Sequence, residues 1–244
     1  MHDERASFVT AMLQGRLALV AGGSRGIGRA AARVLRAAGA EVVQVARTSD
    51  VLEAAAREVG GHAVVADVSD ADAVDWLRRR VEEDFGVPDV VVNAAGSFAL
   101  ASVAETPVGM FDEQVRSNLR APFLLARAFL SAMLARRSGT IVSVGSVAGR
   151  RAFPGNGAYA AAKFGLRGLH AVLDEELRGT GVRAVLIEPA ATDTSLWDAI
   201  DRDANRGLPA PDQMLDPEAV ADAILYAVTR PTSVAIHNVI LERS

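Results

Sequence analysis

The sequence contains no cysteine and, among its 244 residues, a single lysine, two tyrosines and two tryptophans. Without cysteine there can be no disulfide bond, no thiolate nucleophile and no zinc or iron–sulfur site with cysteine ligands, and a reducing compartment is a natural fit. The four histidines are scattered without metal-ligand spacing, so we expect no metal site; they are His2, His62, His170 and His237. Basic side chains number 26 against 30 acidic ones, and this net charge of -4 argues against a nucleic-acid partner.

Long hydrophobic runs are also missing. The longest apolar stretch of helical type, from Ala121 to Leu134, is too short to span a bilayer and contains Arg127. The first residues carry Asp3 and Glu4 and lack the apolar stretch of a signal peptide. We therefore expect no membrane partner and a cytoplasmic location. The composition, half hydrophobic and 23% charged, is typical of a globular protein.

Short runs rich in valine and leucine alternate along the chain with helical patterns. The expected strands are Leu17–Ala21, Glu41–Ala46, His62–Ala66, Val90–Asn93, Thr140–Val144, Val182–Ile187 and Val234–Leu241. The expected helices are Ile27–Ala38, Val51–Val59, Ala71–Phe85, Gly109–Arg137, Gly157–Arg178 and Pro217–Thr229, with Asp50 and Asp70 as N-caps and Gly60 as a C-terminal stop. Most strands are apolar throughout, which is typical of strands covered on both faces. The pattern predicts an α/β fold, a doubly wound parallel sheet in a three-layer α/β/α arrangement.

No repeat, low-complexity tract or linker divides the chain, so we expect one domain over residues 1–244, with 1–15 as an N-terminal extension. The least regular stretch runs from Pro189 to Pro217, where prolines and a glycine interrupt a short helical pattern that contains Leu196, Trp197 and Ile200. A long irregular segment inside a compact domain is often a lid or a binding loop. We expect 189–217 to be a substrate loop, and a plain surface excursion is the alternative.

A glycine-rich run, from Ala21 to Gly28, separates the first expected strand from the first expected helix. Glycines let the backbone turn tightly and approach a pyrophosphate, and the free N–H groups at the start of the following helix bind the anion. The spacing Gly26-x-Gly28-x-x-Ala31 fits the dinucleotide-binding pattern, although a simple turn is the alternative. The expected phosphate contacts are Gly22, Ser24, Arg25, Gly26, Ile27 and Gly28.

The end of the second strand favours one form of the dinucleotide. An acidic residue there would accept a hydrogen bond from a free ribose 2'-hydroxyl, but the chain has Ala46 followed by Arg47, which can pair with a 2'-phosphate. Arg25 favours the same form, although both arginines could instead be solvated surface residues. We therefore expect NADP(H) rather than NAD(H). NAD(H) is the alternative, because Asp50 is close enough in the sequence to supply an acidic side chain.

Tyr159 and Lys163 stand one helical turn apart, on the same face of an expected helix. With two tyrosines and one lysine in the chain, this spacing would arise by chance in roughly 1% of placements. A free phenol has a pKa of about 10, and a neighbouring cation favours the phenolate. We therefore expect Lys163 to lower the pKa of Tyr159. Lysine is a compact point charge whereas arginine is a planar fork, so a narrow site would exclude arginine.

With these motifs the sequence resembles the short-chain dehydrogenase/reductases of the compact single-domain kind, from about Leu17 to the end. The residues that carry the resemblance are Gly22-x-x-x-Gly26-x-Gly28, Asp67, Asn93-Ala94-Ala95-Gly96, Asn118, Ser146, the pair Tyr159 and Lys163, and Pro189. Ala21, Ala94 and Ala190 depart from the family pattern, which has Thr, Asn and Gly there. These changes remove polar or flexible groups around the cofactor, not proton-transfer groups.

The resemblance implies a Rossmann-like oxidoreductase that interconverts a ketone or aldehyde and an alcohol. Tyr159 would be the general acid in reduction and the base in oxidation, and Ser146 would hydrogen bond the substrate oxygen. Lys163 would hold the nicotinamide ribose and lower the pKa of Tyr159, and Asn118 would position a water that links Lys163 to solvent. Further implied cofactor contacts are Asp67 and Val68 at the adenine, Asn93, Ala94, Ala95 and Gly96 along the floor, and Pro189, Thr192 and Thr194 at the nicotinamide. The helices 109–137 and 157–178 resemble those through which the family forms dimers and tetramers, so we expect a homo-oligomer, with a tetramer favoured.

Several residues have simpler explanations. Ser143 competes with Ser146, Asn118 could merely cap or bridge helices, and Asp67 could cap the turn before Asp70. Thr192 and Thr194 could have no role beyond starting the next helix. Four apolar residues, Phe98, Phe153, Leu196 and Trp197, could line a substrate pocket or belong to the core. A different class of function is a nucleotide-binding regulatory or scaffold protein of the same fold without turnover, against which the presence of Asn118, Ser146, Tyr159 and Lys163 together speaks.

Overall fold

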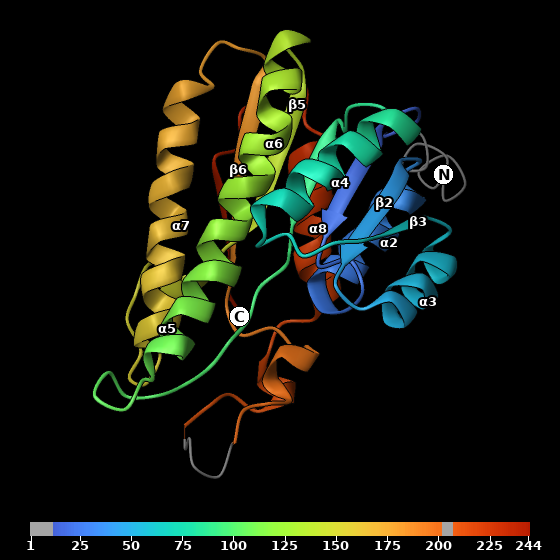
Figure 1. The fold of residues 1–244 in the computed structure, drawn as a ribbon. Coiled ribbons are helices and arrows are strands. Elements are labelled where there is room, and N and C mark those ends of the chain that lie inside the picture. Colours follow the sequence, from blue (N-terminus) through green and yellow to red (C-terminus); the bar gives the residue numbers. More distant parts are fainter. Residues whose placement is uncertain (1–11, 202–206) are drawn as a thin grey trace.

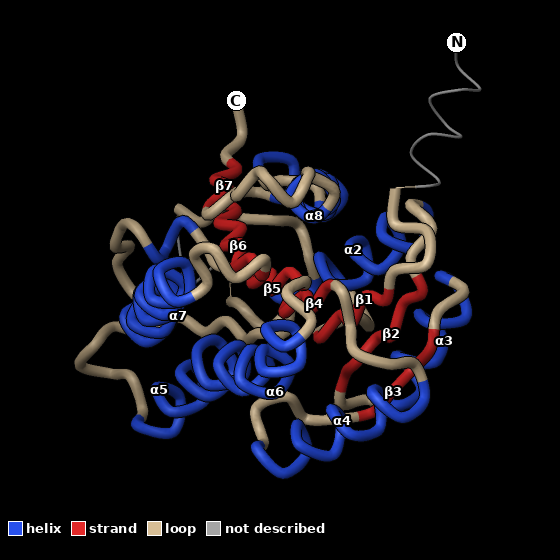
Figure 2. The backbone as a smooth tube through the Cα atoms, turned by 90° about the horizontal axis from the view of Figure 1, so that it is seen from above, coloured by secondary structure: helices blue, strands red, loops and turns tan. Residues whose placement is uncertain are grey.

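A computed structural model describes residues 12–201 and 207–244 of the chain. Within them lies one parallel sheet of seven strands, in the order β3-β2-β1-β4-β5-β6-β7 (Figures 1 and 2). The strands are β1 (Leu17–Ala21), β2 (Glu41–Ala46), β3 (His62–Val65), β4 (Val90–Asn93), β5 (Gly139–Val144), β6 (Val182–Pro189) and β7 (Asn238–Leu241). Every pair of neighbouring strands is parallel, which confirms the predicted doubly wound α/β fold.

The α-helices of the described residues form layers on both sides of this sheet (Figure 2). They are α2 (Gly26–Ala37), α3 (Ser49–Val59), α4 (Ala71–Asp84), α5 (Val108–Val115), α6 (Ala121–Ala135), α7 (Gly157–Glu176) and α8 (Pro217–Val228). Helices α4, α6 and α7 pack on one face, and α2 and α8 on the other. Leu19 of β1 belongs to the first core and its neighbour Val20 to the second. Because successive side chains of a strand point to opposite faces, both faces of β1 must be apolar, which explains the continuous apolar runs.

The strand order reverses beside β1, and this reversal positions the site. Strand β1 lies between β2 and β4, and Ala21 at its end is in register with Asn93 at the end of β4. The chain segments that follow β1 and β4 therefore start side by side at the carboxyl edge of the sheet and then separate. In open α/β sheets, ligands bind in the crevice that such a divergence leaves.

Most expected element ends agree closely with the structure. Asp70 caps α4 by accepting the Ala73 N–H at 2.8 Å, and Gly60 ends α3 with a φ of 73°, both as predicted. The prediction for Asp50 was wrong: Thr48 is the N-cap residue of α3, and Asp50 lies in the first turn. The last strand was predicted too long, because β7 begins only at Asn238, where its pairing with β6 begins.

The single helix predicted over 109–137 is interrupted. Helix α5 passes into a π-helical turn, Arg116–Arg120, before α6 begins. Pro122 explains the position of the turn, because a proline cannot donate the hydrogen bond that residue 122 of an α-helix would give to the carbonyl of Asn118. The Ala121 N–H bonds instead to the Arg116 carbonyl, five residues back. The interruption thus falls on Asn118, a residue singled out from the sequence.

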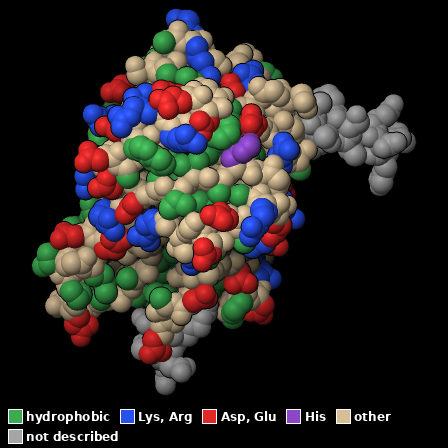
Figure 3. All heavy atoms as spheres, turned by 45° about the vertical axis from the view of Figure 1, so that its right-hand side comes forward, with side chains coloured by type: hydrophobic (Ala, Val, Ile, Leu, Met, Phe, Trp, Pro, Cys, Tyr) green, Lys and Arg blue, Asp and Glu red, His purple; other side chains and the backbone are tan. Residues whose placement is uncertain are grey.

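The sheet ends at β3, whose outer edge borders a shallow groove between α3 and α4 lined by His62, Val65 and Trp76, among others. On this side of the molecule, basic and acidic side chains are interspersed with hydrophobic ones (Figure 3). In the described part of the chain, no helix is both long enough and apolar enough to cross a membrane. Nor do residues 12–201 and 207–244 contain a group of three or more histidine or acidic side chains that could hold a metal ion.

Candidate active site

The loop after β1 needs glycine for two separate reasons. Gly22 and Gly26 have positive φ values, 78° and 51°, which favour glycine. A Cβ atom on Gly22 would lie 2.6 Å from the Ala95 nitrogen, and one on Gly28 would lie 2.2 Å from the Gly22 carbonyl oxygen. The loop can therefore pack against the segment after β4 only if it carries no side chains at these positions.

The first turn of α2, directly after this loop, is left open to an anion. Its N-cap residue, Arg25, makes no side-chain capping hydrogen bond, and the turn contains no acidic residue. The N–H groups at the start of a helix, together with the positive end of its dipole, form a ready binding site for phosphate. The local structure therefore fits the pyrophosphate of a dinucleotide.

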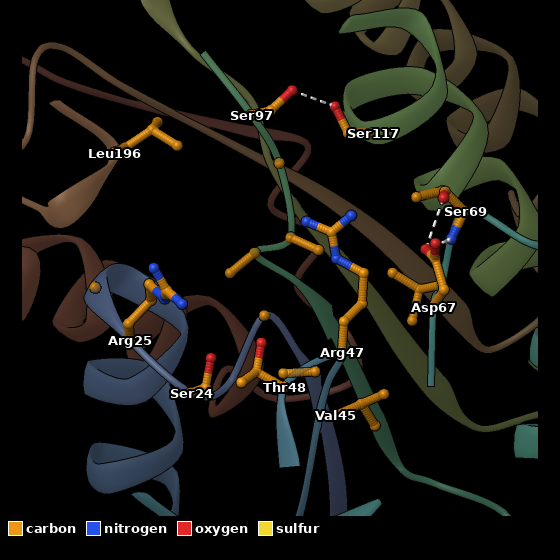
Figure 4. A pocket seen from close by; sticks show the side chains of 18 of the residues that line it. Ser24, Arg25, Val45, Arg47, Thr48, Asp67, Ser69, Ser97, Ser117 and Leu196 are labelled. Carbon is orange, nitrogen blue, oxygen red and sulfur yellow. Dashed lines mark hydrogen bonds between the residues drawn. The ribbon is translucent and has the colours of Figure 1, made fainter. Parts of the chain in front are cut away.

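A cleft of about 1160 Å³ extends from this loop across the carboxyl ends of β1, β2 and β4 (Figure 4). The expected cofactor contacts that line it are Gly22, Ser24, Arg25, Gly26, Ile27, Arg47, Asp67, Val68, Ala94, Ala95, Gly96 and Thr194. Gly28 and Asn93 line neither this cleft nor the adjoining one. Asn93 is buried and its Oδ1 accepts the Ala95 N–H at 3.3 Å. It therefore holds the backbone of Ala95, which lines the cleft, without lining the cleft itself.

The cleft places Arg25, Arg47 and Asp67 around the same space. Figure 4 shows Arg47 extending across the cleft between Arg25 on one side and Asp67 on the other. Asp67 accepts hydrogen bonds from the Ser69 N–H at 2.9 Å and the Ser69 hydroxyl at 2.6 Å. Partial burial opposes ionisation of Asp67, but these bonds and the charges of Arg116 and Arg47 outweigh it, so its pKa is lowered. Asp67 thus both caps its turn and lines the cleft.

The sequence reasoning missed several residues of this cleft. Thr48, Ser69, Ser97, Glu113 and Ser117 all line it. They come from three separate loops and from the turn at the end of α5, and they share no motif. Polar residues at the carboxyl ends of parallel strands were the only available signal.

A second cavity, of about 1510 Å³, adjoins the first and brings the predicted catalytic residues together. Asn118, Ser146, Tyr159 and Lys163 all line it, as do Pro189 and Thr192. The two cavities share part of their lining, namely Ile27, Ala94, Ala95, Gly96, Thr194 and Leu196. They therefore form one continuous groove, which runs from the glycine loop to Tyr159.

The choice between the two serines is decided by position. Ser143 is buried within β5 and lines neither cavity. Ser146 lies just beyond the end of β5, where it lines the second cavity and hydrogen bonds to the phenol of Tyr159. Its Oγ also accepts the Ala148 N–H at 3.1 Å, which fixes the hydroxyl at the start of a short 3-10 helix, Val147–Gly149.

Burial dominates the electrostatics of the tyrosine and the lysine. Loss of solvent raises the pKa of Tyr159 to about 12, and the hydrogen bond with Ser146 lowers it only in part. Burial likewise lowers the pKa of Lys163 to about 8. The Lys163 ammonium donates to the Val144 carbonyl at 2.9 Å and lies 5.5 Å from the centre of the Tyr159 ring. The predicted lowering of the Tyr159 pKa is therefore wrong for the folded chain, because desolvation outweighs the hydrogen bond with Ser146.

Asn118 sits in the π-helical turn, almost completely buried, and its side chain joins two segments. Its Nδ2 donates to the Ser97 carbonyl at 2.9 Å and to the Gln114 carbonyl at 3.1 Å. A Cβ atom on Gly96 would lie 2.7 Å from its Oδ1, so the glycine permits this close approach. Asn118 therefore bridges elements, as the simpler explanation held, and also lines the cavity beside Lys163.

Several described residues of the segment 189–217 line the groove, whereas residues 202–206 lie outside the described residues, as does most of the expected extension 1–15. Thr194 lines both cavities, and its Oγ1 accepts the Leu196 N–H at 3.4 Å at the start of a 3-10 helix, Ser195–Trp197. The indole of Trp197 donates to the Thr192 carbonyl at 3.0 Å. Both threonines thus lie at the groove, and Thr194 also starts a helical turn.

Phe98, Phe153, Leu196 and Trp197 line the second cavity and do not belong to the core. The ring of Phe98 makes edge contacts with Tyr159, at a centroid distance of 4.9 Å, and with Trp197, at 5.0 Å. Of the two alternatives left open for these four residues, the structure shows the cavity lining and not the core. The sequence reasoning missed Leu100, Leu208 and two arginines, Arg151 and Arg243, in the same lining.

Several known proteins are similar to this chain in sequence and in fold. The short chain dehydrogenase family matches residues 16–205. An uncharacterized oxidoreductase of Staphylococcus aureus is 30% identical over 231 residues, which cover 93% of this chain and 97% of that protein. The glycine betaine reductase ATRR of Emericella nidulans is 34% identical over 238 residues, 94% of this chain, but the match spans only 19% of that much longer protein.

A solved structure shows the same agreement in three dimensions. A metagenomic short-chain oxidoreductase in complex with NADP is 34% identical, with a TM-score of 0.81, and the match covers 96% of this chain and 99% of that one. The family match, the relatives and the fold agree with the motifs read from the sequence. The chain belongs to the short-chain dehydrogenase/reductase family and is an NAD(P)-dependent oxidoreductase.

Proposed function

We propose that this protein is an NADP(H)-dependent oxidoreductase that interconverts a ketone or aldehyde with an alcohol, with Tyr159 as the general acid and base. One observation carries the proposal. Tyr159, Ser146 and Lys163 line a single cavity that is continuous with the cleft at the glycine loop. A carbonyl group beside Tyr159 would therefore lie at one end of a groove whose other end fits a dinucleotide.

The residues of the cleft fit NADP(H). The uncapped start of α2 would hold the pyrophosphate, and Arg47 and Arg25 would pair with the 2'-phosphate. Asp67 and Val68 would contact the adenine. Asp50 lines neither cavity, so the described residues offer no carboxylate at the end of β2 for a free 2'-hydroxyl. This favours NADP(H), and NAD(H) remains the alternative. When bound, the nicotinamide cofactor supplies or accepts the hydride.

The side chains around Tyr159 would handle the proton. In reduction the phenol gives its proton to the substrate oxygen, and in oxidation the phenolate takes it back. Its raised pKa suits the reductive direction, because the phenol keeps its proton at neutral pH. The Ser146 hydroxyl would donate a hydrogen bond to the same oxygen as negative charge develops on it. Lys163 would hold the nicotinamide ribose, and Asn118 would position a water for proton supply.

Pro189, Thr192 and Thr194 would flank the nicotinamide, which is supported by their positions along the shared groove. We keep the expected organisation, one catalytic domain over 1–244 with a substrate loop at 189–217, as part of the proposal. The single sheet and the position of the described loop residues over the groove support it. A cytoplasmic location remains a prediction from composition.

We also propose that the protein is a homo-oligomer, a dimer or tetramer. Large hydrophobic side chains are exposed on α5, α6 and α7: Phe111, Phe123, Phe164 and Val172 are each 44% to 54% accessible. Exposed apolar groups gathered on neighbouring helices are typical of an interface between subunits. Light scattering at micromolar concentration tests the proposal, and a single monomeric mass would refute it.

The two tyrosines provide a matched test of the activity. NADPH is mixed with a panel of ketones and aldehydes, and its oxidation is followed at 340 nm for the wild type, Tyr159→Phe and Tyr226→Phe. Tyr226 is exposed, on α8, and lines neither cavity. We expect Tyr159→Phe to lose at least about 100-fold in rate, as fits removal of a general acid. Tyr226→Phe should keep the wild-type rate.

Two outcomes would contradict these proposals. If NADPH binds but no carbonyl compound of a broad panel is reduced, the regulatory or scaffold alternative holds. If Tyr159→Phe and the wild type turn over at equal rates, Tyr159 has no role in proton transfer. NADPH binding, measured by fluorescence, shows that the variant remains folded.

A further inference from the structure

The cavity beside Tyr159 has an unusual charge distribution. Among the described residues that line it are three cations, Lys163, Arg151 and Arg243, and no aspartate or glutamate. The chain as a whole has more acidic than basic side chains. A cavity that is cationic within a net acidic protein favours an anionic ligand, because its field raises the local concentration of that ligand.

The two arginines are not explained by the cofactor. Neither Arg151 nor Arg243 lines the cleft at the glycine loop, where Arg25 and Arg47 are the cations. They lie instead in the part of the groove that contains Tyr159 and the apolar residues. Phe98 and Leu100, from the segment that follows β4, line the same cavity as Arg243. The positive charge therefore belongs to the substrate half of the groove.

Arg151 is held in place by its neighbours. Its guanidinium pairs with Glu242 at 3.1 Å and lies 5.2 Å from the centre of the Phe153 ring. The preceding Arg150 anchors the same loop to the end of the sheet, through Glu188 at 2.6 Å and Asn238 at 2.7 Å. The Arg151 side chain is 60% exposed, so its guanidinium remains accessible to the carboxylate of a ligand.

Arg243 supplies the charge that remains uncompensated. No ion pair of Arg243 occurs within 12–201 and 207–244, whereas Glu242 is already paired with Arg151. Arg243 follows closely after Leu241, which is held in register with Pro189 at the end of β6. Of the two guanidiniums, that of Arg243 is therefore the one without an ion pair to a side chain of the described residues.

The rest of the cavity is lined mainly by apolar side chains and favours a substrate with a large apolar part. Phe98, Leu100, Phe153 and Leu208 line it together with Trp197. Such a wall excludes a small, fully polar substrate and favours one with an aromatic or aliphatic chain.

We propose that the substrate of this enzyme is an oxo acid, a carbonyl compound with an apolar body whose carboxylate is bound by Arg243 and Arg151. This inference rests on the carbonyl reductase activity proposed above and names its substrate class. Arg243 and Arg151 act as specificity-determining residues: they select the acid over its neutral analogues and take no part in proton transfer.

A matched series of substrates tests the inference. The probes are phenyl ketones that carry a terminal carboxylate after two to six methylene groups, each paired with its methyl ester, at saturating NADPH. We expect the wild type to prefer at least one acid over its ester by about two- to fivefold in kcat/KM, the range of a solvent-exposed charge pair. The preference should shrink as sodium chloride is added, because salt screens exposed charges.

Three substitutions distinguish a charge effect from a loss of structure. Arg243→Gln should lower the acid-to-ester ratio of kcat/KM. Glu242→Gln removes the competing carboxylate and should raise this ratio, a gain that misfolding cannot produce. Arg178→Gln is the control, because Arg178 is exposed, pairs with Glu175 and lines neither cavity, and it should leave both activities unchanged.

Equal kcat/KM values for acid and ester throughout the series would overturn the inference and leave the proposed activity intact. The inference also fails if Arg243→Gln and Glu242→Gln shift both members of each pair alike. If neither acids nor esters oxidise NADPH, the proposed carbonyl reductase activity itself fails, and the substrate class fails with it.

Discussion

The Lys163 ammonium lies 5.5 Å from the centre of the Tyr159 ring, one turn further along α7, and donates to the Val144 carbonyl at 2.9 Å. Lys163 is the single lysine of the chain, and the other 25 of its 26 basic side chains are arginines. Its side chain therefore spans the narrow space between α7 and the end of β5.

The first prediction concerns this size requirement. Lys163→Arg keeps the charge but introduces a larger, planar fork at a buried position. We expect a loss of about 100-fold in kcat/KM for carbonyl reduction, comparable to a misplacement of about 1 Å. Circular dichroism and NADPH binding serve as controls for the fold. An unimpaired variant would mean that the site does not require lysine.

The second prediction is a pH dependence. Burial lowers the pKa of Lys163 to about 8, so the ammonium loses its charge above this pH, whereas Tyr159, with a pKa of about 12, keeps its proton. We expect kcat/KM for reduction to be level below pH 7 and to fall above about pH 8, because this parameter reports the ionisation of the free enzyme. In Lys163→Met the fall should be absent. A wild-type profile that stays level to pH 10 would contradict the prediction.

The third prediction concerns the choice of cofactor. Arg47 extends across the cleft at the end of β2, where a 2'-phosphate would lie (Figure 4). We expect Arg47→Ala to weaken NADPH binding by about tenfold or more, the range of a charge-assisted hydrogen bond, and to leave NADH binding nearly unchanged. Dissociation constants from fluorescence titration provide the measurement. Arg29→Ala is the control, since Arg29 pairs with Glu58 and lines neither cavity. Equal losses for NADPH and NADH would argue against the assigned phosphate contact.

The fourth prediction concerns stability in acid. His170 is buried in α7, which lowers its pKa to about 4, compared with about 6.5 in an unfolded chain. Between these values the unfolded state binds one more proton than the folded state, so the free energy of unfolding decreases as the pH falls from 6.5 towards 4. The decrease due to this residue is up to about 3 kcal/mol.

Urea unfolding at pH 7 and pH 5 measures this effect. His170→Leu should show a smaller loss of stability between the two values than the wild type does. His237→Gln should behave like the wild type, because the His237 side chain is 61% exposed. Carboxylates contribute equally to all three proteins and cancel in the comparison. Identical losses in wild type and His170→Leu would show that His170 does not control acid stability.

Much of the fold was predictable because its elements have strong local signals. The bounds of β1, β2 and β4 agree with the prediction to the residue, since strands covered on both faces must be apolar throughout. Asp70 and Gly60 were identified from local capping chemistry alone. The start of α3 was not, because Asp50 and Thr48 both suit an N-cap, and only the direction of the chain leaving β2 decided between them.

Some features of the candidate site could likewise be predicted from the sequence, and others could not. The spacing of Tyr159 and Lys163 on one helix, and the strand–glycine–helix order of the phosphate loop, place these groups by local geometry, so the sequence was sufficient. The pKa of Tyr159 was predicted with the wrong sign, because desolvation depends on everything packed around the phenol and not on one charged neighbour.

The sequence by itself determined the layered α/β fold and the position of the glycine loop at the cleft, because both depend on periodicity or on spacing over a short stretch of chain. The predicted catalytic residues Ser146 and Asn118 came only from the resemblance to the family. Only the tertiary structure decided what surrounds the reacting end of the groove. It brought Arg151, from the loop after β5, and Arg243, from the end of the chain, into one cavity with Tyr159. Contacts between residues so far apart in the chain arise from the packing of β6 and β7, and no local pattern records them.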